Sequence, residues 1–260
     1  MNKSFFEFKQ QTDKPNTLEL YIYTTVQDDY ITYDWENHCF KNVKSETSAD
    51  FFRQKLSEYE SVEFINVYIN SLGGSVMEGV AIYNQLKRHS AFKTVYIDGF
   101  ACSVASVIAM AGNKVVMPVN AVMMIHNAWT YCEGNAADMR KCADDLDKIN
   151  EASRQAYIQK SNGKIKEEKL IELLEAESYL TAKDCLEYGF ADELAEQNGD
   201  ITYAKQLSQE LRKNNYQQYY SRLESIIATA ERSKNPQSPQ STEKTFDEKA
   251  NDIFKKFLNV

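Results

Sequence analysis

The feature that most constrains the fold is an order of apolar strand, glycine and helix that occurs twice in succession. One unit spans 62–89, where the β-branched stretch VEFINVYIN leads through Gly73 and Gly74 into a stripe of apolar residues at helical spacing. The second spans 93–112, where KTVYID is followed by Gly99, read as a turn, and by an apolar helix. Strands that alternate with helices in this way predict an α/β fold with buried strands.

Further elements extend this pattern on both sides. Strands are expected at 18–26, 114–117 and 121–125. Helices are expected at 48–59, with Ser48 as a candidate N-cap, at 135–160, at 166–176 and, between a Thr181 cap and a Gly189 stop, near the end of the domain. From about residue 196, Gln, Asn, Ser and Lys dominate. We therefore expect a polar leader at 1–17, a folded domain at 18–195, and a polar C-terminal extension at 196–260 that is partly helical or disordered.

Composition and charge exclude several classes of protein. A net charge of -8 argues against a nucleic-acid partner, which needs a clustered positive surface. Five scattered cysteines without a CxxC pair suggest a reducing compartment, with neither a disulfide framework nor a zinc site, and three histidines argue against a histidine-rich metal centre. The N-terminus lacks the apolar core of a signal peptide, and the apolar run 99–112 is shorter than the roughly 20 residues of a membrane span. These features predict a cytoplasmic protein that needs no metal, cofactor or membrane.

The apolar run GFACSVASVIAMAG (99–112) contains two serines. Ser103 lies at the expected start of a helix, where unpaired N–H groups and the helix dipole favour a developing oxyanion. The alternative is that Ser103 is only an N-cap, which is the commonest reason for a serine at that position. Position alone favours the cap, so a catalytic interpretation needs partners elsewhere in the chain.

Possible partners follow in the sequence. His126 ends the strand AVMMIH and could act as a general base, although a structural hydrogen bond to the backbone is the alternative. Glu177 could orient the imidazole, with Glu175 as a rival. Gly73 and Gly74 allow backbone N–H groups to approach a ligand closely, but a plain turn would also use them.

Four blocks of the chain, in order, resemble the signature blocks of the Clp protease proteolytic subunit. They are INSLGGSV, GFACSVASVIAMAG, MMIHNAW and ESYLTAKDCLEYGFAD, and the resemblance covers about 18–194. The branch that looks most similar is the Clp-like head maturation (prohead) proteases of tailed phages. Two departures stand out, since Leu72 replaces the usual proline and Glu177 replaces an aspartate.

The resemblance implies a role for six residues. Ser103 would be the nucleophile, His126 the base and Glu177 the acid. Gly73 and Val104 would supply the oxyanion-hole N–H groups, and Gly74 would belong to the strand that aligns substrate. Ser106 falls where the family has small residues, which implies packing.

The implied fold is the ClpP/crotonase-like superhelix of strand–strand–helix units, with 135–160 as a protruding handle helix and a ring-shaped homo-oligomer as the assembly. The implied activity is that of a serine endopeptidase acting on a protein or peptide substrate. We expect a phage maturation protease that cleaves capsid or scaffold protein inside an assembling prohead. The alternatives are a bacterial Clp subunit fed by an ATP-driven unfoldase, and a catalytically weak structural assembly protein. An acyl-CoA-binding crotonase relative is disfavoured, because the serine and histidine lie in protease-type blocks.

Overall fold

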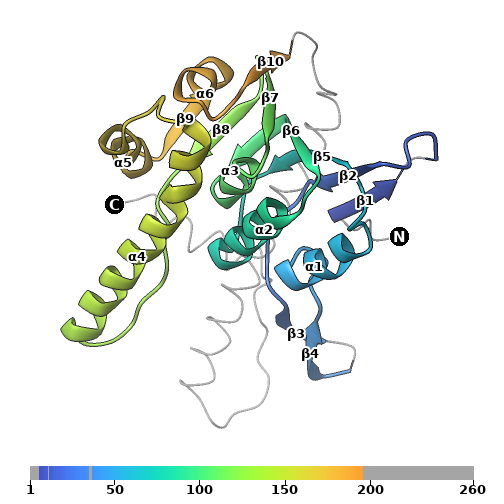
Figure 1. The fold of residues 1–260 in the computed structure, drawn as a ribbon. Helices are drawn as coiled ribbons and strands as arrows, with labels where there is room; N and C mark the ends of the chain where they lie inside the picture. Colours follow the sequence, from blue (N-terminus) through green and yellow to red (C-terminus); the bar gives the residue numbers. More distant parts are fainter. Residues whose placement is uncertain (1–5, 11, 35–36, 196–260) are drawn as a thin grey trace, which may run out of the picture. The chain divides into compact units, whose positions relative to one another are not determined.

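The computed structural model describes residues 6–10, 12–34 and 37–195. The expected C-terminal extension, 196–260, lies outside the described residues. Helices and strands alternate along the described chain, and most of the strands form one mixed sheet (Figure 1). This arrangement confirms the predicted α/β class. None of the described helices is both long and apolar enough to cross a membrane.

Eight strands form the main sheet. Six of them lie in the order β1 (Phe6–Gln10), β2 (Thr17–Ile22), β5 (Phe64–Ser71), β6 (Phe92–Cys102), β7 (Lys114–Pro118) and β10 (Glu193–Ala195). β8 (Val122–Ile125) pairs with β6, and β9 (Ser178–Thr181) pairs with β8. Within the described part of this sheet, only the β1–β2 and β8–β9 pairs are antiparallel. The strands at the centre are therefore parallel. Over most of β5 and β6, fully buried apolar residues alternate with half-buried ones, so one face of the sheet forms the core.

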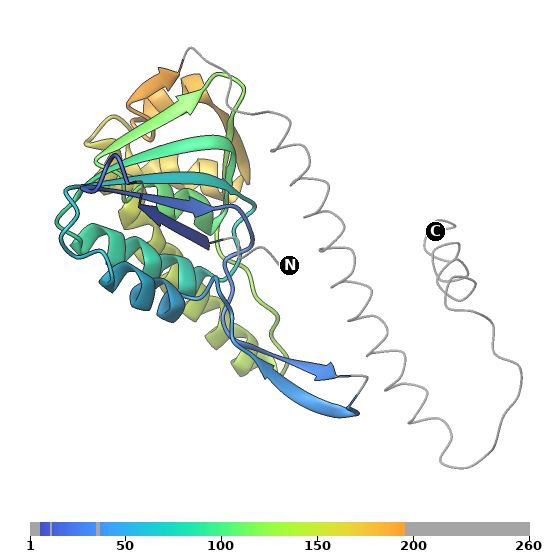
Figure 2. The same cartoon turned by 90° about the vertical axis from the view of Figure 1, so that its right-hand side faces the viewer.

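Three helices, α1 (Ala49–Ser57), α2 (Val76–Arg88) and α3 (Val104–Ala109), cover one face of the sheet (Figure 1). α4 (Ala136–Ser161) is the long handle and extends past the sheet, while α5 (Glu167–Glu175) and α6 (Ala182–Tyr188) pack near its C-terminal end (Figure 1). Figure 2 shows the hairpin β3 (Tyr30–Asp34) and β4 (Cys39–Val43) extending away from the main sheet.

Local sequence signals set several helix ends as predicted. The Ser48 side chain accepts a hydrogen bond from the Phe51 N–H and caps α1. Thr181 and Asp184 form a capping box at the start of α6, and Gly189 ends that helix in the left-handed conformation. Each of these bonds satisfies a backbone group that the end of a helix leaves unpaired.

The predicted turn at Gly99 is wrong, because β6 continues to Cys102. The strand changes partner instead of turning. Residues 94–96 pair with β7, whereas 100–102 pair with β8. A strand that passes from one neighbour to another keeps its backbone hydrogen bonds, so the chain needs no turn there.

Five strands lie where the sequence pattern indicated none. β1 falls within the expected polar leader 1–17, and the β3–β4 hairpin, β9 and β10 were not anticipated. The burial pattern of the hairpin explains the omission. Its strands are mostly exposed on both faces, so they lack the alternation of apolar and polar residues that marks a half-buried strand.

The structure also corrects the expectation that the cysteines are all unpaired. Cys132 and Cys142 form a disulfide with their Cα atoms 6.6 Å apart. Cys132 lies in the loop that follows β8, and Cys142 lies in the second turn of α4. The loop folds back beside the helix, so two residues that look scattered in the sequence become neighbours.

The face of the sheet opposite α1–α3 carries a row of stacked tyrosines. The rings of Tyr21 and Tyr68 are 4.7 Å apart, and those of Tyr68 and Tyr96 are 5.1 Å apart. Burial raises the pKa of Tyr68 to about 12. Asp98 lies on the same face and accepts a hydrogen bond from the Tyr23 hydroxyl, and burial raises its pKa above the usual range.

Candidate active site

Ser103 lies where β6 ends and α3 begins. Its backbone has φ 54° and ψ −132°, a conformation that L-amino acids rarely adopt and that clusters at functional sites. The Ser103 N–H donates to the Met124 carbonyl at 2.8 Å, which joins this position to β8. Ser103 occupies the N-cap position, but its side chain makes no capping hydrogen bond to α3. The hydroxyl is therefore available for another partner.

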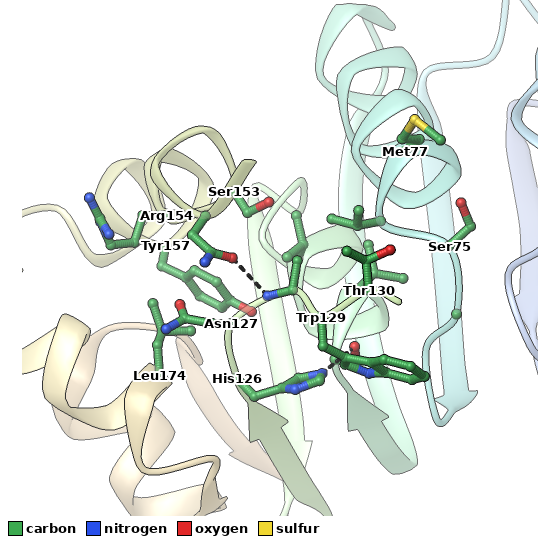
Figure 3. A pocket seen from close by; sticks show the side chains of 17 residues that line it. Ser75, Met77, His126, Asn127, Trp129, Thr130, Ser153, Arg154, Tyr157 and Leu174 are labelled. Carbon is green, nitrogen blue, oxygen red and sulfur yellow. Dashed lines mark hydrogen bonds between the residues drawn. The ribbon is translucent and has the colours of Figure 1, made fainter. Parts of the chain in front are cut away.

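That partner is His126, directly after β8. The distance from His126 Nε2 to Ser103 Oγ is 2.7 Å, which is a good hydrogen bond (Figure 3). β8 pairs with the end of β6, so the two side chains leave neighbouring strands at the same edge of the sheet. The sheet brings together two residues that are 23 positions apart in the sequence.

Cys102, next to Ser103, is a second potential nucleophile. Its side chain is buried, and this desolvation raises the pKa of the thiol to about 11. A thiol must lose its proton to become nucleophilic, so Cys102 is inert near neutral pH. Ser103 is the nucleophile that the geometry favours.

Ser106 does more than provide a small packing residue. It is fully buried, and its hydroxyl contacts both the Ser103 carbonyl and the Tyr157 hydroxyl of α4, the latter at 2.6 Å. Tyr157 is itself buried, which raises the pKa of its phenol well above the usual value. The Ser103 turn is therefore hydrogen-bonded to the handle helix. The sequence held no local signal for this pair, because its members are 51 residues apart.

Gly73 packs directly against the Ser103 turn. A Cβ atom at Gly73 would lie 2.6 Å from Ser103 Cβ and 2.7 Å from the Cys102 carbonyl oxygen, and the backbone has φ +96°. Only glycine satisfies both conditions. The Gly73 N–H donates to Ser71 Oγ at 3.1 Å, so it has an internal partner in this structure.

The remaining backbone positions also lie close to Ser103. Gly74 lines the pocket beside Ser103, has φ +145°, and forms a parallel bridge with Val26. Val104 is the first residue of α3, so its N–H is among the amides that have no partner within the helix. These positions could supply an N–H to a negatively charged oxygen beside Ser103 Oγ.

Glu177 lies close to His126 along the backbone. Ile125 pairs with Ser178 in the β8–β9 ladder, so His126 and Glu177 are the next residues on the two strands. Glu177 has φ 49°, and its side chain is exposed. Within the described residues, neither Glu177 nor Glu175 forms a hydrogen bond with the His126 ring. Glu175 instead lines a polar cleft between α4 and α5.

A pocket of about 310 Å³ opens beside Ser103 and His126. The start of α2 forms one wall, α3 and the loop after His126 form others, and α4 closes the far side (Figure 3). Asn150 of α4 accepts a hydrogen bond from the Ala128 N–H at 2.7 Å, which fixes this loop to the handle helix. No cluster of three or more metal-ligating side chains occurs in the described part of the chain.

Comparison with known proteins agrees with this architecture. Residues 37–198 match the Clp protease family. The chain is 30% identical over 136 residues to the ATP-dependent Clp protease proteolytic subunit of Deinococcus radiodurans, and 31% identical over 140 residues to the protein of that name in Ligilactobacillus salivarius. These matches cover 51% and 53% of this chain, and 65% and 70% of the relatives. The chain belongs to the Clp protease family, and its fold is ClpP-like.

Proposed function

We propose that the chain is a serine endopeptidase in which Ser103 is the nucleophile and His126 is the general base. The observation that carries the proposal is the 2.7 Å contact between His126 Nε2 and Ser103 Oγ, made from a strained backbone at the edge of a pocket. Histidine is suited to this role because its ordinary pKa is close to neutrality.

In the proposed reaction, His126 Nε2 takes the proton of Ser103 Oγ as that oxygen attacks the carbonyl carbon of a peptide bond. The Val104 N–H would hold the resulting oxyanion. The Gly73 N–H would join it by exchanging its Ser71 partner for the oxyanion. His126 then gives its proton to the leaving amine, and water hydrolyses the acyl-enzyme by the reverse sequence.

We assign Glu177 as the acid that orients His126, the third member of the catalytic triad. Its backbone lies next to that of His126 in the strand register, and its side chain is exposed. A carboxylate hydrogen-bonded to the imidazole would hold the ring in the correct tautomer and stabilise its charged form.

Labelling with a serine-directed fluorophosphonate tests the assignment. Wild-type protein should be labelled, Ser103→Ala should not, and His126→Ala should be labelled at least a hundredfold more slowly, since activation by a base typically contributes a factor of about 10² to 10⁴. Labelling that persists in Ser103→Ala would refute the nucleophile. A wild-type protein that is never labelled would favour the structural assembly protein.

For the biological role, we propose a head maturation protease that forms a ring-shaped homo-oligomer and cleaves capsid or scaffold protein. The support is the resemblance of the four sequence blocks. Co-expression with a capsid protein should yield a shortened capsid product, and that product should be absent with Ser103→Ala.

A second candidate is a Clp proteolytic subunit in the bacterial cytoplasm. The names of the two relatives favour it, since both are ATP-dependent Clp protease proteolytic subunits. This candidate predicts that degradation of a folded protein requires ATP and an unfoldase. Capsid cleavage without ATP would count against it.

A further inference from the structure

The pocket beside Ser103 contains a buried hydroxyl that has no partner. Ser153 Oγ of α4 is buried and forms no hydrogen bond within the described residues. Figure 3 shows Ser153 on the side of α4 that faces Thr130, while Arg154 extends in the opposite direction. A buried polar group costs free energy unless it is hydrogen-bonded, so a molecule that fills this pocket has to provide a partner for Ser153.

The rest of that wall is polar and uncharged. Asn127, Thr130 and Asn150 also line the pocket, and Asn150 is held in place by the Ala128 N–H. The one charged lining residue, Arg154, is paired with Glu167, with 3.4 Å between Arg154 Nε and Glu167 Oε1. The Glu167 carboxylate offsets the charge of Arg154, but within the described residues Arg154 Nε forms no hydrogen bond. The pocket therefore presents neutral hydrogen-bonding groups between apolar walls.

The neighbouring cleft disfavours an acidic occupant. It shares Asn127, Asn150 and Arg154 with the pocket, and four carboxylates face it against two cations. The carboxylates belong to Asp144, Asp147, Glu151 and Glu175. A negatively charged side chain in the pocket would lie close to this excess of negative charge.

We propose that this pocket takes the side chain of the substrate residue whose carbonyl Ser103 attacks, and that it selects an uncharged amide, glutamine above all, with Ser153 as a specificity-determining residue. The inference rests on the proposed function. Glutamine combines an apolar stem for the walls with a terminal amide that can both donate to and accept from Ser153. Methionine has nearly the same length and shape but would displace water from Ser153 and leave the hydroxyl unpaired.

Fluorogenic peptides that differ only in the acyl-side residue test the proposal in the full-length protein. For wild-type protein, kcat/KM for the glutamine peptide should exceed that for the methionine peptide about fivefold, the factor that one neutral hydrogen bond supplies. The glutamate peptide should be cleaved more slowly than the glutamine peptide, because its carboxylate would lie close to the negative charge of the neighbouring cleft. The lysine peptide is the competitor that this charge alone would favour, so cleavage of glutamine ahead of lysine is the result expected if the pocket selects an amide. In Ser153→Ala, the glutamine-to-methionine ratio should fall to about one, mainly through slower cleavage of glutamine.

Ser57→Ala is the matched control, because it removes an exposed serine hydroxyl from α1 and should leave the ratio unchanged. Alanine suits a helix interior, and the rate of fluorophosphonate labelling reports whether Ser153→Ala keeps an intact nucleophile. Normal labelling with methionine or lysine preferred over glutamine, or with a ratio that Ser153→Ala does not alter, would overturn this inference alone. Absence of both labelling and cleavage in wild-type protein would overturn the proposed function, and this inference with it.

Discussion

The hydrogen bond between Ser106 and Tyr157 links the turn that carries Ser103 to the handle helix, and its contribution to stability can be measured by a double-mutant cycle. In Ser106→Ala, the buried Tyr157 hydroxyl loses its partner, which should cost about 2 kcal/mol of unfolding free energy. The Ser103 carbonyl still accepts the N–H of residue 106 at 2.9 Å, so it is not left unpaired. Tyr157→Phe should cost less, about 1 kcal/mol, because Ser106 Oγ keeps the Ser103 carbonyl as an acceptor.

The double variant removes both hydroxyls and leaves neither unpaired. It should therefore cost less than the sum of the single variants, with a coupling of about 1 to 2 kcal/mol. Urea denaturation of the four proteins measures these differences. Ser161→Ala is a matched control, since it removes another buried serine hydroxyl whose only partner among the described residues is the Ile158 carbonyl. It should leave fluorophosphonate labelling unchanged, whereas Ser106→Ala should slow it. Costs that add in the double variant would refute the argument.

Three further predictions follow from particular contacts. Gly73→Ala should reduce fluorophosphonate labelling at least tenfold, whereas Gly163→Ala, which has a similar φ of +82° but no neighbour within 4 Å, should leave it unchanged; equal effects would mean that backbone strain, not contact with the nucleophile, is responsible. Burial raises the folded-state pKa of Asp98, so the folded protein binds the extra proton and the stability of the wild type falls as pH rises through that pKa. The unfolding free energy of Asp98→Asn relative to that of the wild type should thus grow as the pH rises above the ordinary aspartate pKa of about 4, and a constant difference would contradict this. Replacing both Cys132 and Cys142 by serine should cost about 2 kcal/mol, and a reductant should lower the Tm of the wild type to that of the variant; a wild-type Tm that the reductant leaves unchanged would refute the disulfide.

The sequence predicted those parts of the fold that depend on local signals. Ser48 and Thr181 cap helices and Gly189 ends one, because each acts within a single turn of backbone. The stretches at 62–70 and 93–98 form most of β5 and part of β6, because β-branched and aromatic residues favour a strand. These signals can be recognised in the sequence without knowledge of tertiary contacts.

Non-local contacts account for what the sequence did not reveal. Gly99 was read as a turn because nothing in a strand marks the point where it changes partner from β7 to β8. The disulfide and the Ser106–Tyr157 pair depend on α4 returning to the nucleophile turn. In the candidate site, too, one part could be predicted from the sequence and another could not. Ser103 and His126 meet across one strand pair, whereas the orientation of the Glu177 side chain is set by no local pattern.

The pairing of β6 with β8 has a consequence for how such a chain tolerates insertions and deletions. Residues 100–102 pair with 122–124, and the two side chains of the proposed catalytic pair extend from the ends of this ladder. Successive residues of a strand point to opposite faces, so one residue gained or lost between 103 and 122 that shifted the ladder would turn His126 to the wrong face. The β3–β4 hairpin lies outside this ladder and can change length without altering its register. Natural variation in chain length should therefore gather in the hairpin, and the spacing from Ser103 to His126 should stay fixed.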